Sequence, residues 1–125
     1  MIYLINMQAA WVSFLFGALS GAVIGMFFHK EYWLGGYQTF SRRLLRLGHI
    51  AFFGIGLLNL AFYQATQINP LSIWFSYASP AFLAAFSMSL ICFLSAWKHL
   101  FRHLFFIPVL SLMSGIILTM AGILL

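Results

Sequence analysis

The residues best suited to chemistry in this sequence are four histidines and a cluster of arginines at the start of one apolar stretch. Residues 41–63 read SRRLLRLGHIAFFGIGLLNLAFY, in which Arg42, Arg43 and Arg46 precede His49 and a long apolar run follows. A histidine at this depth can ligate haem iron while arginines bind the propionates. It can equally be a polar residue that is hydrogen-bonded where a helix meets lipid headgroups.

The composition of the chain indicates an integral membrane protein. Of 125 residues, 64% are hydrophobic and only 6% are charged, with a mean hydropathy of +1.03. A soluble domain cannot bury that much apolar surface. The net charge of +5 would suggest nucleic acid in a soluble protein, but basic residues at the ends of membrane segments contact anionic headgroups instead. The first expected partner is therefore the lipid bilayer, and no nucleic acid partner is expected.

Apolar segments predict an all-α integral membrane fold, a bundle of four transmembrane helices in a single domain over residues 1–125. Ser41 is expected to cap the second helix, and Ser79 and Pro80 are expected to start the third as cap and first-turn proline. The connection over residues 64–79 would then lie along the membrane interface. Only helices satisfy their backbone within lipid without closing a barrel. The expected spans are about 8–28, 42–63, 80–97 and 104–125.

The distribution of charge predicts the orientation in the membrane. With four spans the two termini share one side, and all six lysines and arginines fall on the other. Basic loops prefer the cytoplasmic side. We therefore expect both termini on the non-cytoplasmic side, in a bacterial inner membrane or an organellar inner membrane.

Small and polar residues predict which helix faces pack. In the first span they recur every four positions, a spacing that lets another backbone approach closely. Such a face can pack within the bundle or against another subunit. An asparagine in the middle of a span usually hydrogen-bonds across the bundle. The packing residues expected on these grounds are Ser13, Gly17, Gly21, Gly25, Gly56, Asn59 and Gly115.

The four histidines all belong to the basic side, each on a small-residue face of its helix, so we expect them to converge. Haem b is the favoured cofactor, with His49 and His103 as the axial pair because both lie just inside a span. His29 and His99 would serve a second haem or only hydrogen-bond. The expected propionate partners are Arg42, Arg43, Arg46 and Arg102.

One resemblance and one alternative bear on this cofactor prediction. The placement of histidines at helix ends resembles that of the membrane cytochrome b subunits of respiratory enzymes. The resemblance lies in layout rather than in a sequence motif, and no residue is assigned from it. A divalent metal held by His49 and His103, with Glu31 as an oxygen ligand, is the weaker functional alternative.

The sequence predicts a small integral membrane subunit of a larger complex, of the respiratory or electron-transfer kind. Haem b at its cytoplasmic helix ends is the favoured hypothesis among those with a cofactor. The expected partners are other membrane subunits and, at the haem edge, a quinone. One alternative is a cofactor-free accessory or assembly subunit, and another is metal handling or transport. Catalysis by the chain alone is poorly supported, because the spans contain no carboxylate and no nucleophilic triad.

Overall fold

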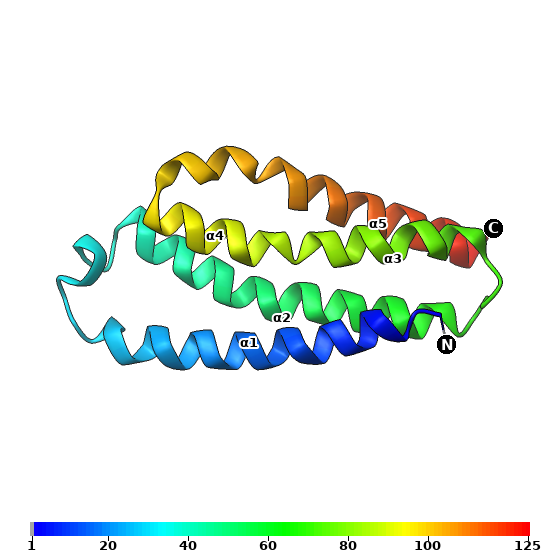
Figure 1. Cartoon of the computed structure of the whole chain (residues 1–125), viewed down its shortest axis with the longest axis horizontal. Coiled ribbons are helices and arrows are strands. Elements are labelled where there is room, and N and C mark those ends of the chain that lie inside the picture. The colour runs from blue at the N-terminus through cyan, green and yellow to red at the C-terminus, as the bar shows by residue number, and fades with distance from the viewer. Residues whose placement is uncertain (1) are drawn as a thin grey trace.

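The computed structural model describes residues 2–125 and is helical, with no strand in that range (Figure 1). Four stretches of it are long and apolar enough to cross a membrane, which indicates a membrane protein with a four-helix transmembrane bundle. The elements in chain order are α1 (Leu4–Phe28), the 3₁₀ helix η1 (Trp33–Gly35), α2 (Phe40–Thr66), α3 (Ile73–Ala85), α4 (Ser87–Trp97), the 3₁₀ helix η2 (His99–Leu104) and α5 (Phe106–Leu124).

The helices pack mainly in three pairs: α1 along α2, α2 along α4, and α3 along α5. The third span consists of α3 and α4, so it changes its main neighbour at the helix break at Phe86. Figure 1 shows α1 and α5 on the two outer sides of the molecule. It also shows both termini at one end, opposite the turns that contain η1 and η2.

The third span begins at Ile73, which corrects the expectation that Ser79 and Pro80 start it. Pro80 lies inside α3 and is exposed at the molecular surface. A membrane helix tolerates an internal proline because neighbouring groups can satisfy the carbonyls that it frees. The interfacial strip expected over residues 64–79 is therefore wrong, and the connection between helices shortens to residues 67–72.

The second span also starts earlier than expected, and a different residue caps it. Thr39 is the N-cap of α2, and its Oγ1 accepts a hydrogen bond from the backbone N–H of Arg42 at 3.4 Å. Ser41, the expected cap, instead donates its hydroxyl to the carbonyl of Ala96 at 3.0 Å. This bond ties the start of α2 to the end of α4.

Small residues of α1 form the contact with α2. Ser13 donates its hydroxyl to the backbone carbonyl of Phe52 at 2.5 Å, which is a direct bond between the two helices. Gly17 and Gly21 leave room for ring side chains of α2, since an added Cβ would meet those rings at 2.7 Å and 2.4 Å. Among the described residues nothing lies within 4 Å of a Cβ added at Gly25. The close approach therefore ends one turn before the end of α1.

A buried polar network joins the first three spans near the terminal end of the bundle. The Nδ2 of Asn6 donates to the Oδ1 of Asn59 at 2.8 Å, and the Ser79 hydroxyl donates to the Oδ1 of Asn6 at 2.5 Å. Both asparagines are fully buried. Asn59 also donates to the carbonyl of Phe82 at 3.2 Å. In a regular α-helix that carbonyl would accept from the N–H of Phe86, but the Phe86 N–H donates to the carbonyl of Leu83. Asn59 thus supplies a donor to a carbonyl at the break in the third span.

Aromatic rings of α3 pack against glycines of α5. A Cβ added at Gly115 would lie 3.2 Å from the ring of Phe82, and one added at Gly122 would lie 2.4 Å from the ring of Phe75. Both rings belong to a buried apolar cluster that also contains Phe62 and Ala78. This cluster fills the terminal half of the molecule, where α2, α3 and α5 meet.

Candidate functional site

His49 is the one expected site histidine that lies within a helix interface. Its ring is half-buried and points its Cε1 edge into the notch at Gly21. Its Nδ1 lies 3.3 Å from the hydroxyl of Ser20, and Phe53 packs edge-on against it with ring centroids 5.5 Å apart. His49 is therefore fixed between α1 and α2 by a glycine, a hydroxyl and an aromatic ring.

The other three histidines are exposed at the basic end of the molecule. His29 follows the last residue of α1. His99 begins η2, where its ring meets Phe40 edge-on at 5.0 Å and its Nε2 lies 3.5 Å from the Ser41 hydroxyl. His103 also belongs to η2. Because η2 is a 3₁₀ helix with three residues per turn, side chains four apart differ by about 120°. His99 and His103 therefore do not share a face.

The structure does not bring the expected axial pair together. His103 lines a groove with Leu44 and Leu47 of α2, whereas His49 faces α1. At 3.6 residues per turn, Leu44 and Leu47 point to the opposite side of α2 from His49. The body of α2 therefore lies between the two imidazoles. Within residues 2–125 no three histidine, cysteine, aspartate or glutamate side chains gather as a metal-binding group.

Arg42 is buried in the protein, where its side chain binds the turn between α1 and α2. It is only 1% exposed, and its guanidinium donates to the backbone carbonyls of Trp33 at 2.7 Å, Phe28 at 3.5 Å and Lys30. It also lies 4.4 Å above the ring of Tyr37, a favourable cation–π contact. One guanidinium therefore binds the carbonyls at the end of α1 and in the following loop, and so fastens this loop to α2.

The remaining arginines named as propionate partners are exposed and spread over the basic end. Arg43 donates to the carbonyl of Gln38 at 3.0 Å. Arg46 lies 5.8 Å above the ring of Phe28, beside the seam between α1 and α2. Arg102 belongs to η2 and lines the same groove as His103. These charges face different neighbours, so they do not converge on one anion.

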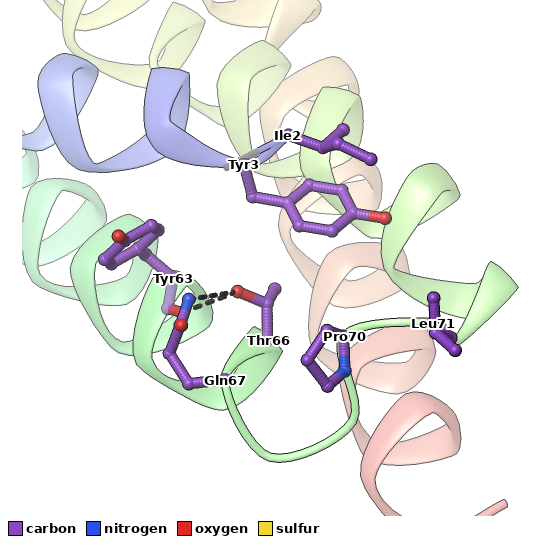
Figure 2. Close-up of a pocket in the computed structure, with 7 residues that line it drawn as sticks. All are labelled: Ile2, Tyr3, Tyr63, Thr66, Gln67, Pro70 and Leu71. Atoms are coloured by element: carbon purple, nitrogen blue, oxygen red, sulfur yellow. Dashed lines mark hydrogen bonds between the residues drawn. The ribbon is translucent and has the colours of Figure 1, made fainter.

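A partly enclosed cavity lies at the opposite end, beside the chain termini (Figure 2). It has a volume of about 210 Å³ between the start of α1, the end of α2 and the following turn. Figure 2 shows Tyr3, Tyr63, Thr66 and Gln67 around it, with Gln67 donating to the Thr66 hydroxyl at 3.2 Å. Its lining residues include no charged side chain, histidine or cysteine.

Sequence reasoning missed Asn6, which completes the buried network with Asn59. Asn6 lies before the expected start of the first span at about residue 8, so that span does not include it. The sequence signal is spacing, because steps of four, three and four residues put Asn6 on the same helix face as Ala10, Ser13 and Gly17. Those four residues are all buried.

Comparison of the chain with protein-family models, with curated proteins and with solved structures gives no match.

Proposed function

We propose that this chain is a small structural subunit of a larger membrane complex, without a redox centre of its own. It spans a bacterial or organellar inner membrane with its basic end in the cytoplasm, matrix or stroma. Its task is to pack against a transmembrane helix of a partner subunit. The observation that carries this proposal is an open face of α2.

The open face, here called the α2 seam, consists of Ile50, Gly54, Leu57 and Ala61. All four are exposed although α2 is the central helix of the bundle. Among the described residues nothing lies within 4 Å of a Cβ added at Gly54. Their spacing of four, three and four residues is that of a helix–helix seam. A small residue at its middle allows the close approach by which membrane helices associate.

A role without a redox centre is supported by five buried polar side chains that connect helices or loops to one another. Asn6, Asn59 and Ser79 bond to one another, Ser13 bonds across to α2, and Arg42 bonds to backbone carbonyls. Each of these groups fastens one helix or loop to another. Buried polar groups that are already satisfied stabilise a fold and are poorly placed to bind a ligand.

Haem b remains the second candidate, and His49 is the observation that favours it. Its imidazole is half-buried and lies one helical turn from Arg46. The interface between α1 and α2 opens beyond it, at Gly25. The reduced-minus-oxidised visible spectrum of the purified protein, with haem extraction, separates the two proposals. A flat spectrum from folded protein supports the structural subunit. One haem per chain, lost in His49→Ala, overturns the cofactor-free proposal.

The partner helix is tested by photo-crosslinking in native membranes. A photoreactive amino acid at Leu57 is expected to give one discrete heteromeric adduct, whereas the same residue at Leu15 on the exposed side of α1 is not. Gly54→Leu should abolish the Leu57 adduct, and Gly25→Leu, the matched change at another open glycine, should leave it intact. An adduct of twice the chain mass would instead show a homodimer. Equal labelling from both positions would mean that lipid covers the seam.

A further inference from the structure

A groove opens at the basic end because α4 and α5 follow different neighbours. α4 is held on α2 by the bond from Ser41 to Ala96 and by Gly48, where an added Cβ would lie 2.8 Å from the ring of Phe93. α5 packs along α3 and has little contact with α4. The six residues of η2 join the two helices. At about 2 Å of rise per residue they carry the chain roughly 12 Å, about one helix diameter, away from α4.

The walls of this groove are apolar. Leu44 and Leu47 of α2 form one side, Met88 of α4 forms another, and Val109 of α5 forms the third. The groove has a volume of about 570 Å³ and extends along α5 only from η2 to Val109. It is a short wedge that ends where α5 approaches the third span, so it is too short for a transmembrane helix. A flexible hydrocarbon chain fits this shape.

The rim of the groove is basic. Arg102 and His103 line it at the basic end of the molecule, and both side chains are exposed. Within residues 2–125 no side-chain hydrogen bond or ion pair holds the guanidinium of Arg102, whereas Arg42 and Arg43 both bond to carbonyls. The residues that line the groove include no acid. Its positive charge is therefore available to an anion that arrives from the headgroup region.

We propose that this groove is a binding site for one anionic phospholipid. An acyl chain lies between Leu47, Met88 and Val109, and the phosphate accepts hydrogen bonds from Arg102, with His103 beside it. Guanidinium suits this role because its planar fork of donors matches the geometry of phosphate oxygens. The groove adjoins the α2 seam, because Leu47 lies one turn before Ile50 on the same face of α2. Arg102, His103 and Val109, which carry this proposal, belong to η2 and α5 instead.

The test uses phosphatidylglycerol with a photoactivatable group in its acyl chain, added to the whole protein in lipid nanodiscs. Mapped adducts are expected on the segments around Met88 and Val109. Arg102→Ala should lower the yield about fivefold, because it removes the charged donor that contacts the phosphate. Arg43→Ala, an exposed arginine at the same end, should leave the yield unchanged. Val109→Trp fills the groove and should also lower the yield, and because Val109 is exposed, the fold should survive.

Three outcomes would overturn the proposal. Adducts spread evenly over the outer face of α1 and the groove would mean that lipid contacts are unselective. Equal loss in Arg102→Ala and Arg43→Ala would reduce the effect to general attraction of an anionic lipid to a basic end. Equal labelling by a phosphatidylcholine probe with the same acyl chain would show that the site does not distinguish anionic from zwitterionic lipid. Thermal unfolding of each variant verifies that the comparison is made between folded proteins.

Discussion

At the scale of single residues, the His49 imidazole is closely inserted at Gly21. An added Cβ at Gly21 would lie 2.4 Å from the Cε1 of that ring, closer than atoms can approach. The ring is also held by the Ser20 hydroxyl and by Phe53. Gly21 and His49 therefore act as a pair: the glycine is needed because the histidine is there.

We expect Gly21→Ala to destabilise the protein by about 1–3 kcal/mol, the usual cost of forcing extra volume into a packed site. Gly25→Ala adds the same methyl group one turn later, where the described residues leave open space, and should be close to neutral. Thermal unfolding in detergent measures both. In a His49→Ala background the cost of Gly21→Ala should disappear. Equal costs for the two glycines would show that the notch is not occupied as described.

The buried asparagines provide a second prediction at this scale. Asn6→Leu and Asn59→Leu should each lower stability by about 1–2 kcal/mol, because each leaves the other amide without its partner. The double variant should cost less than the sum, with a coupling of about 0.6–1.7 kcal/mol, the range measured for hydrogen bonds between membrane helices. Strictly additive costs would mean that the bond from Asn6 to Asn59 does not form in the membrane.

At the scale of elements, Arg42 determines the shape of the turn between α1 and α2. Its guanidinium donates to carbonyls of the chain before η1 and to that of Trp33, the first residue of η1, so the loop is shaped around one side chain. Leu34, Gly35 and Gly36 in this loop have positive φ angles. Non-glycine residues seldom adopt such angles unless the surroundings hold them. The interactions of Arg42 compensate for this strain.

Arg42→Ala is therefore expected to loosen residues 30–39 and to lower stability by about 2–3 kcal/mol, as for loss of hydrogen bonds to a charged group. Hydrogen–deuterium exchange of the loop amides should become at least tenfold faster, which corresponds to about 1.4 kcal/mol. Arg42→Lys should rescue little, since an ammonium cannot reproduce the guanidinium fork. Arg43→Ala serves as the control, and similar exchange in both alanine variants would contradict this role.

The apolar length of each segment was enough to predict four membrane helices, whereas local signals misplaced some of their ends. Ser79 and Pro80 have the local signature of a helix start, but α3 begins at Ile73. Nothing in the local sequence reveals that Asn6 bonds to Ser79 from another helix. Periodicity correctly groups residues on one face of a helix, yet it does not say which neighbour covers that face. The expectation that His49 and His103 pair rests on their similar depth at the ends of two spans, and depth does not reveal that α2 lies between them.

At the scale of the whole molecule, the basic turns lie at one end and the termini at the other (Figure 1). The positive-inside rule then predicts a cytoplasmic basic end. Cysteine introduced at Tyr32 should react with an impermeant maleimide only after the membrane is opened, whereas cysteine at Leu71 should react in intact cells. Both positions are highly exposed, at 88% and 96%, and the native Cys92 is fully buried. The reverse labelling pattern would invert the proposed orientation.

The change of neighbour within the third span has a consequence for biogenesis. α1, α2 and α4 can associate as soon as three spans have left the translocon, but Phe75 and Phe82 of α3 pack against Gly122 and Gly115 of α5. Those glycines belong to α5, which is synthesised after α3. The half of the molecule around Phe75 and Phe82 can therefore pack only after α5 has also been synthesised. A chain cut before α5 would leave these two rings without the glycines that receive them.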